Sequence, residues 1–253
     1  MTFSLRLAAA FAAVLAFALP QSGRAAEVSA AQRGEIEKIV HDYLVAHPEV
    51  LQEAMTELEK RQAAADEQKH KVAVKEHSEA LFSSPDQVTL GNPKGNVTFV
   101  EFFDYNCGYC KHAMSDMLTL MKSDPNLKVV LKEFPVLGPG SVEAARVAVA
   151  VRMQDPKKYL DFHTKLLGGR GAADAARAIA VAKEVGLDVD RLQKDMKSPE
   201  VEKTLQQDFK LADALGLNGT PSYVIGESVV VGAIGLKGLQ EKINGARCGK
   251  ATC

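Results

Sequence analysis

Apolar residues recur at helical spacing in the first part of the chain. Between about residue 32 and residue 82 they lie three or four positions apart, which is the period of one helical face. After Pro48, which suits a first helical turn, the apolar stripe continues over residues 50–58. The pattern predicts two short amphipathic helices, and the apolar face of the first comprises Ile36, Ile39, Val40, Tyr43 and Leu44.

Residues 59–79 consist mostly of Glu, Lys, Gln, Ala, Asp and His, with too few apolar positions to bury a face. This composition predicts a solvated helix or a helical linker. The apolar stripe before it has two interpretations: it packs onto its own chain, or it pairs with copies of itself. Because an exposed, charged connector separates the stripe from everything downstream, we favour a homo-oligomer formed through residues 32–60, either a dimer or a trimer.

From residue 87 onwards the spacing of apolar residues changes. Residues 97–103 form a β-rich apolar run, residues 107–121 have helical spacing, and residues 127–136 form a second strand candidate. These three segments predict a β-α-β unit.

A long, alanine-rich region follows the β-α-β unit. Its helical patterns cover residues 142–153, 156–167, 172–185, 189–196 and 199–215. A hairpin of residues 222–225 and 228–233, and a closing helix over residues 236–244, then complete the chain. The prediction is one α/β domain that is interrupted by helices.

The N-terminus has the features of a secretory signal peptide. Arg6 precedes an apolar run over residues 7–19, and Pro20 and several small residues follow. The run is too short for a membrane-spanning helix of about 20 residues. We therefore expect cleavage and export to a bacterial periplasm. The predicted organisation is a signal peptide over 1–26, a helical region with its linker over 27–84, and a domain over 85–253 with a helical insertion at about 139–216.

Composition and charge exclude several classes of protein. The 253 residues are 46% hydrophobic and 25% charged, which are ordinary globular values and argue against wholesale disorder or a small disulfide scaffold. The 31 basic and 32 acidic residues give a formal charge of -1, so the sequence gives no support for a nucleic-acid partner.

Cys107, Gly108, Tyr109 and Cys110 form a C-x-x-C motif between the first predicted strand and the helix that follows it. At a helix N-terminus, unpaired N–H groups and the positive end of the dipole stabilise a thiolate and lower its pKa to about 3.5 to 7.5. Cys107 is therefore the predicted nucleophile. Cys110, one turn further in, is shielded and is the predicted resolving thiol. We expect no cofactor beyond a redox-active Cys107–Cys110 disulfide.

A C-x-x-C motif can also be half of a zinc site, which needs two further ligands. The two other cysteines, Cys248 and Cys253, lie in a glycine-rich tail. Because the motif joins a strand to a helix in a chain with a secretory signal, we favour a redox dithiol and expect no metal site. The tail pair is predicted to form a small structural disulfide, and an unpaired or regulatory thiol pair is the alternative.

Two motifs far apart in the chain resemble the DsbA-like branch of the thioredoxin superfamily. They are VEFFDYNCGYC over residues 100–110 and GTPSY over residues 219–223, with helices between them. The resemblance covers about residues 85–246 and implies an α/β thioredoxin fold with an inserted helical domain. It also implies a cis bond before Pro221, facing the C-x-x-C motif, with substrate held by the backbone of Thr220 and contacted by Gly108 and Tyr109. Without the resemblance, Thr220 and Pro221 would be assigned to an ordinary turn.

Glu101 lies six residues before Cys107 and matches the buried acid beneath the reactive disulfide of this family. Its neighbours in the predicted strand are apolar, and burial of an unpaired carboxyl group raises its pKa, so Glu101 can pass protons to or from Cys110. The alternative is an exposed edge glutamate. Gly108 and Tyr109 replace the proline and histidine of the archetypal motif, which removes one hydrogen-bond donor to the thiolate.

A second resemblance concerns the helical region. Residues 35–44 (EIEKIVHDYL) and 47–51 (HPEVL) resemble the N-terminal region of Com1-like proteins and of the suppressor of copper sensitivity protein C (ScsC) family. In that family such a region oligomerises the catalytic domains, which agrees with the self-association expected from the apolar stripe.

Three functions are compatible with these features. We favour a periplasmic disulfide isomerase or reductase that acts on protein disulfides, because Thr220 before the proline resembles the isomerase pattern and an oligomer suits that activity. The alternatives are a DsbA-like oxidase that introduces disulfides and a copper-binding or scaffolding module. The expected partners are secreted proteins with cysteines and a membrane thiol reductase as the electron donor.

Overall fold

The computed structural model describes residues 28–253, so the predicted signal peptide lies outside the described residues. The chain divides into two compact units, the first ending at Lys60 and the second comprising Arg61–Cys253. The domain predicted from the sequence begins later, at residue 85. The difference arises because apolar side chains between Arg61 and that point are buried in the second unit.

The first unit contains the helix α1 (Ala30–Ala46) and the beginning of α2 (Glu49–Glu76). Ser29 caps α1: its hydroxyl accepts the Gln32 N–H at 3.3 Å, while the Gln32 side-chain oxygen accepts the Ser29 N–H at 3.0 Å. Helix α1 begins before Ile36, the first residue of its apolar stripe, whereas α2 begins directly before its stripe. Four residues of the first stripe are each more than half exposed: Ile36, Ile39, Val40 and Tyr43.

Helix α2 is one continuous helix of 28 residues, not a short helix followed by a separate connector. It has no internal proline or glycine, and alanine, glutamate, lysine and glutamine have high helix propensity. The prediction that residues 59–79 bury no face is wrong at the C-terminal end. Val74 is only 3% exposed and packs in the core of the second unit.

The short helix α3 (Ser78–Phe82) fixes the end of this segment to the sheet. Leu81 is completely buried. The ammonium groups of Lys132 and Lys128 donate hydrogen bonds to the carbonyl oxygens of Ala80 at 2.9 Å and Phe82 at 2.6 Å. Cations at a helix C-terminus satisfy carbonyls that have no partner within the helix, so α3 belongs structurally to the domain that follows it.

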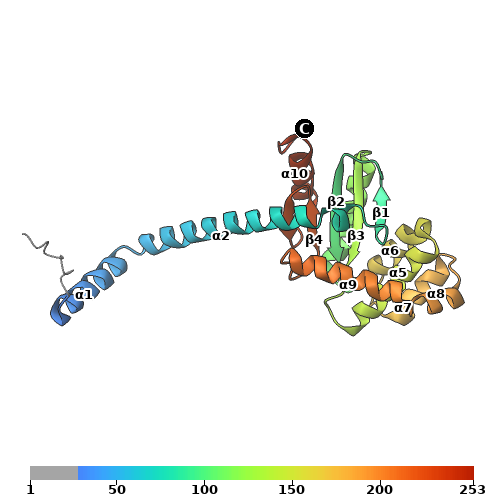
Figure 1. Ribbon diagram of the computed structural model, residues 1–253, viewed down its shortest axis with the longest axis horizontal. Coiled ribbons are helices and arrows are strands. Elements are labelled where there is room, and N and C mark those ends of the chain that lie inside the picture. Colours follow the sequence, from blue (N-terminus) through green and yellow to red (C-terminus); the bar gives the residue numbers. More distant parts are fainter. Residues whose placement is uncertain (1–27) are drawn as a thin grey trace, which may run out of the picture. The chain divides into compact units, whose positions relative to one another are not determined.

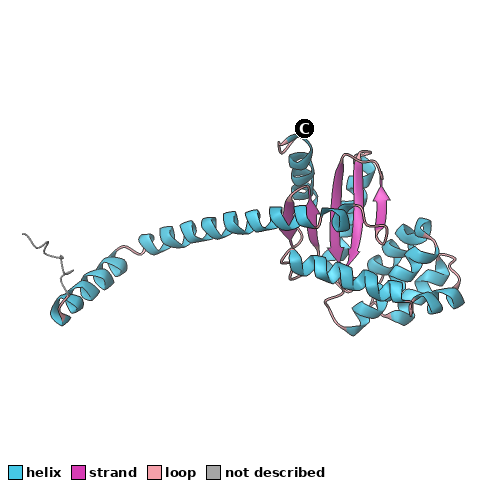
Figure 2. Ribbon diagram, viewed as in Figure 1, coloured by secondary structure: helices cyan, strands magenta, loops and turns pink. Residues whose placement is uncertain are grey.

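The sheet contains five strands in the order β1-β3-β2-β4-β5. Strands β2 (Val97–Phe103) and β3 (Leu127–Glu133) are parallel, while β1 (Val88–Gly91), β4 (Ser222–Ile225) and β5 (Ser228–Val231) join the sheet antiparallel. The β-α-β unit and the hairpin are confirmed, whereas β1 was not predicted. Figure 2 shows the strands together in one sheet among the helices.

The two faces of the sheet have separate cores. Helices α4 (Gly108–Ser123) and α10 (Gly235–Cys248) cover the face that contains Phe99 and Phe103, whereas α3 and α9 (Pro199–Ala214) cover the face that contains Val100 and Phe102. Successive side chains of a strand point to opposite faces. Glu101 therefore lies on the face that α4 covers, the helix that carries the C-x-x-C motif.

A helical region separates β3 from β4. It contains α5 (Pro139–Gln154), a short 3-10 helix (Pro156–Lys158), α6 (Tyr159–Gly168), α7 (Ala175–Glu184), α8 (Val189–Asp195) and α9. Helix α5 contacts all the others and is buried along most of its alanine-rich length, and Figure 1 shows the group beside the sheet. The predicted thioredoxin fold with an inserted helical region is confirmed. No helix of residues 28–253 has the length and apolarity that crossing a membrane requires.

Candidate active site

Cys107 is the N-cap residue of α4. Its sulfur accepts a hydrogen bond from the backbone N–H of Cys110 at 3.2 Å, which satisfies one of the donors that a helix start leaves unpaired. Both cysteines are free thiols in the structure, so it represents the reduced form of the predicted pair. The Cys107 side chain is 6% exposed and Cys110 is completely buried. The first cysteine is thus the more accessible one.

The surroundings of Cys107 favour its thiolate. Hydrogen bonds from the Cys110 thiol, from the Thr220 side chain and from the backbone N–H groups of Cys110 and Tyr109 lower the pKa of Cys107 to about 6, although partial burial acts in the opposite direction. At pH 7 about nine tenths of this group is then ionised. The pKa of Cys110 is raised far above its ordinary value by its hydrogen bond to Cys107 and by burial.

These opposite shifts predict the pH dependence of alkylation. Iodoacetamide should modify Cys107 with a midpoint near pH 6 and should leave Cys110 unmodified in the folded protein, because only the thiolate reacts and only Cys107 is accessible. Mass spectrometry of samples quenched between pH 4 and pH 9 measures both. A midpoint near the ordinary thiol value of about 8.5 would show that the helix start does not stabilise the thiolate.

The two motifs of the sequence meet at the Cys107 sulfur. The carbonyl oxygen of Thr220, 113 residues further along the chain, lies 3.2 Å from it and accepts the thiol proton. The Thr220–Pro221 bond is cis, as the family resemblance implies. The Pro221 carbonyl accepts the Gly232 N–H at 2.9 Å, and Ser222 then begins β4, the neighbour of β2. The sheet therefore holds the proline loop against the start of α4.

Glu101 is buried beneath the cysteine pair, not exposed at an edge. It is 3% exposed, and among residues 28–253 no protein group donates a hydrogen bond to its carboxyl group. Burial, the charge of Cys107 and the charge of Asp116 raise the pKa of Glu101 to about 8. The charge of Glu101 in turn helps to raise the pKa of Cys110. The two groups are thus electrostatically coupled.

Gly108 and Tyr109 form the exposed rim of the motif. Tyr109 is 72% exposed, and a side chain at position 108 would point into open space. His112 is also exposed, and its Nδ1 donates a hydrogen bond to the Gly108 carbonyl oxygen at 2.8 Å. The rim residues are positioned to contact whatever approaches the Cys107 sulfur.

Sequence reasoning missed Asn106, which ties the motif to the helical region. Its side-chain amide donates to the Ala173 carbonyl and to the Ser141 hydroxyl, both at 2.9 Å, and its side-chain oxygen accepts the Ala173 N–H at 2.7 Å. These partners lie 35 and 67 residues away in sequence. No local sequence pattern predicts these partners. The only signal in the sequence is that Asn106 directly precedes Cys107.

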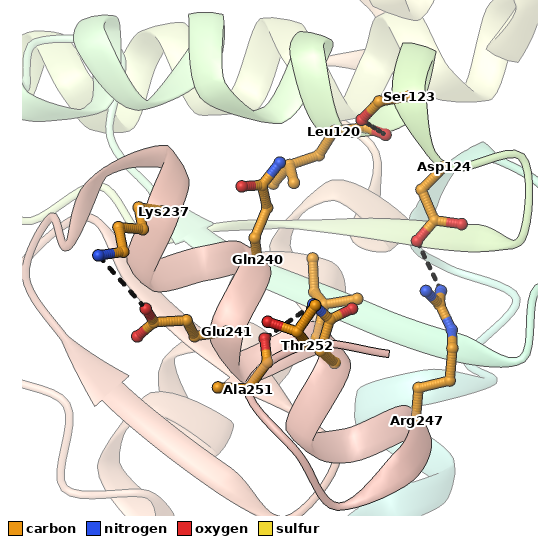
Figure 3. Close-up of a pocket in the computed structure, with 11 residues that line it drawn as sticks. Leu120, Ser123, Asp124, Lys237, Gln240, Glu241, Arg247, Ala251 and Thr252 are labelled. Atoms are coloured by element: carbon orange, nitrogen blue, oxygen red, sulfur yellow. Dashed lines mark hydrogen bonds and ion pairs between the residues drawn. The ribbon is translucent and has the colours of Figure 1, made fainter.

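The tail cysteines lie away from this site. Cys248 and Cys253 form a disulfide in the structure. A hollow of about 560 Å³ lies beside them, with Leu120, Gln240 and Thr252 among its lining residues. Figure 3 shows the Arg247–Asp124 ion pair at its edge, 2.6 Å long. Neither cysteine of the motif lines this hollow, and within residues 28–253 no cluster of three or more His, Cys, Asp or Glu residues could hold a metal ion.

Comparison with known proteins identifies the fold family. The model of the DSBA-like thioredoxin domain matches residues 98–244, which include both motifs of the site. The chain belongs to the DsbA-like thioredoxin family. A second family model, the copper resistance protein ScsC N-terminal domain, matches residues 32–65. This DsbA-like protein therefore combines a thioredoxin domain with an ScsC-type N-terminal segment.

Solved structures agree with this assignment. A thioredoxin-like oxidoreductase from Silicibacter pomeroyi is 46% identical, with 67% of this chain and 96% of that chain covered and a TM-score of 0.64. A linker-deletion mutant of Proteus mirabilis ScsC is 27% identical, with 89% and 100% covered and a TM-score of 0.67.

Among curated relatives, the Na(+)/H(+) antiporter NhaA of Herminiimonas arsenicoxydans is 32% identical over 139 residues. The match covers 53% of this chain but only 21% of the antiporter. The DsbA-like protein thus spans about a fifth of the length of that relative.

Proposed function

We propose that this DsbA-like protein is a thiol-disulfide oxidoreductase that acts on protein disulfides as an isomerase or reductase. The observation that carries the proposal is the Cys107 sulfur at the start of α4, between the Cys110 N–H and the Thr220 carbonyl oxygen, each at 3.2 Å. The Cys110 N–H stabilises the Cys107 thiolate, Cys110 supplies a buried second thiol, and the Thr220 backbone beside the sulfur offers a surface for an extended client segment.

The reaction begins when the Cys107 thiolate attacks one sulfur of a client disulfide. A bond forms between Cys107 and that sulfur, the client S–S bond breaks, and the other client sulfur leaves as a thiolate. In isomerisation, another client thiol then attacks the mixed disulfide, forms a new client disulfide and restores the Cys107 thiolate. No net electrons are transferred in this cycle.

In reduction, Cys110 resolves the mixed disulfide. It loses its proton and attacks the Cys107 sulfur, which forms the Cys107–Cys110 disulfide and releases the client as a thiolate. The client gains two electrons and the protein loses two. Once Cys107 is in a mixed disulfide it carries no charge, so one of the influences that raise the pKa of Glu101 is removed. The Glu101 carboxylate can then accept the Cys110 proton.

The helical region over residues 32–60, which we call the N-terminal arm, favours isomerase activity over oxidase activity. Several active sites on one oligomer can act on one misfolded client, and the apolar face of α1 is uncovered in the described part of this single chain. Thr220 before the cis proline resembles the isomerase pattern. The apolar run over residues 7–19 after Arg6 supports a periplasmic location, where a membrane thiol reductase would return the pair to the dithiol form.

An interface variant tests the role of the arm. Ile39→Glu with Tyr43→Glu places two charges one turn apart on the apolar face of α1, where the native side chains are 67% and 53% exposed. We expect a monomer in light scattering, reactivation of scrambled ribonuclease that is about tenfold slower, and insulin reduction within about twofold of the wild type. Gln62→Glu, an exposed change in α2, is the matched control and should change neither property. A monomer that isomerises as fast as the wild type would contradict the proposed role.

A further inference from the structure

A groove lies directly beside the Cys107 sulfur, on the side of the helical region. Its volume is about 490 Å³. Tyr105, Asn106 and Cys107 form one wall, and Leu166, Leu167 and the loop over residues 169–172 form the other. The charged side chains in its lining are Lys111 and Arg170, and both are positive. We call this feature the basic groove.

Lys111 spans the two walls of the basic groove. It lies one helical turn after Cys107, whose carbonyl oxygen accepts the Lys111 N–H at 3.1 Å. Its ammonium group donates a hydrogen bond to the Gly169 carbonyl oxygen at 2.6 Å. Arg170 is exposed on the opposite wall and forms no ion pair with any described residue. One cation is thus held in place beside the nucleophile, and a second is available to a ligand.

A third cation, Arg177, packs against the loop over residues 169–172. The Arg177 guanidinium packs against Gly169 and Gly171, so closely that a Cβ atom at position 169 would lie 1.8 Å from it. The Arg177 Nε atom is buried and has no hydrogen-bond partner. The glycines therefore allow a positive charge to approach the groove wall closely.

The basic groove is preformed. The three hydrogen bonds of the Asn106 side chain join its two walls at Ala173 and Ser141. Nearby acids are already occupied: Asp104 accepts the Asn106 and Leu137 N–H groups at 2.7 and 2.9 Å, and Asp174 caps α7 through the Arg177 N–H at 2.9 Å. Neither of these carboxylates is among the lining residues of the groove, and because the walls are already joined, a ligand would not have to order them.

We propose that the basic groove selects client segments in which an aspartate or glutamate lies next to the reactive cysteine. This inference rests on the proposed thiol-disulfide exchange and adds its substrate preference. A client sulfur that approaches Cys107 places its neighbouring side chain within the groove, where a carboxylate is attracted by Lys111 and Arg170. Electrostatic complementarity of this kind acts mainly on the rate of association and on the choice of partner.

Short peptides that differ by one residue test the proposal. Each carries a single cysteine as a mixed disulfide with 4-thiopyridine, a neutral leaving group, and has either glutamate or glutamine before or after the cysteine. Stopped-flow absorbance at pH 7 and low ionic strength measures release of thiopyridine by the full-length reduced protein. We expect the glutamate peptide of at least one pair to react about three- to fivefold faster, and this ratio to fall towards one in high salt.

Variants of Arg170 give the decisive comparison. Arg170→Glu should bring the ratio to one or below, and Arg170→Gln should give an intermediate value. Because each ratio is measured within one variant, a change in the pKa of Cys107 cancels. Lys94→Glu is the matched control: Lys94 is exposed and precedes the start of β2, whereas Cys107 follows its end, so the length of the strand separates them.

The outcomes separate the two proposals. If no peptide releases thiopyridine, the proposed thiol-disulfide exchange is wrong. If all peptides react at equal rates, or if Arg170→Glu leaves the ratio unchanged, the exchange stands and the selectivity of the basic groove is wrong.

Discussion

Cys107→Ala should reduce the reaction with a small aromatic disulfide by at least a factor on the order of 10³. The reason is that Cys107 supplies the stabilised thiolate, whereas the sulfur of Cys110 is completely buried and its pKa is raised far above the ordinary value. Cys110→Ala should instead leave the first attack largely intact and accumulate the mixed disulfide on Cys107, because the resolving thiol is missing.

Ellman's reagent resolves the two steps. The reduced wild-type protein should release two equivalents of thionitrobenzoate, the first by attack of Cys107 and the second when Cys110 closes the disulfide. Cys110→Ala should release one equivalent and retain the other as a covalent adduct, visible by mass spectrometry. Cys248 and Cys253 contribute nothing while they remain disulfide-bonded. Rapid release of one equivalent by Cys107→Ala would reverse the assignment of the two thiols.

Glu101→Gln should slow the second release of thionitrobenzoate by about 100-fold and change the first by little. The amide is similar in size to the carboxyl group but cannot accept the proton that Cys110 must lose, and positioned general bases contribute factors of about 10² to 10⁴. Glu133→Gln is a matched control, since Glu133 is also a buried glutamate with a raised pKa but hydrogen-bonds Tyr159 at 2.8 Å. Equal slowing of both steps, or in both variants, would indicate a general packing effect.

The same substitution should change how stability depends on pH. The pKa of Glu101 is about 8 in the folded protein and near its ordinary value of 4.5 in the unfolded chain. Below about pH 4.5 the carboxyl group is protonated in both states and does not oppose folding. Between about pH 4.5 and pH 8 the unfolded chain ionises more readily, so the free energy of unfolding falls by at most about 1.4 kcal/mol per pH unit. Urea unfolding at pH 5 and pH 8 should show Glu101→Gln more stable relative to the wild type at pH 8. If the difference in free energy of unfolding between the variant and the wild type were the same at both pH values, the Glu101 carboxyl group would be solvated.

The local sequence pattern was sufficient to predict the strand and the helix start that position the C-x-x-C motif. The apolar run before Cys107 predicted β2, and the position of the motif at a strand-to-helix junction predicted a thiolate at the N-terminus of α4. Strand alternation then accounts for Glu101, since it shares a face with Phe99 and Phe103. Recognition of the GTPSY motif was needed for Pro221, because a cis bond leaves no periodic signal.

Long-range contacts account for what the sequence did not predict. Strand β1 has only four residues, and its place in the sheet depends on pairing with β3, about 40 residues later. Val74 lies in a charged helical segment and is buried only because it packs in one core with residues of α3, α9 and the sheet. The basic groove depends on Asn106 joining two loops that are 67 residues apart. Tertiary packing, not local propensity, determines each of these features.

The proposed isomerase or reductase activity is tested most directly by the redox state of Cys107 and Cys110 in growing cells. Cultures are quenched in acid, free thiols are alkylated with a maleimide that adds mass, and the protein is then separated by size. A Cys107→Ala, Cys110→Ala double variant shows where the unlabelled protein migrates and tests that the tail disulfide takes no label. The proposal predicts that most of the wild-type protein carries two labels, as a dithiol. A pair found mainly as the disulfide would contradict it and support a DsbA-like oxidase.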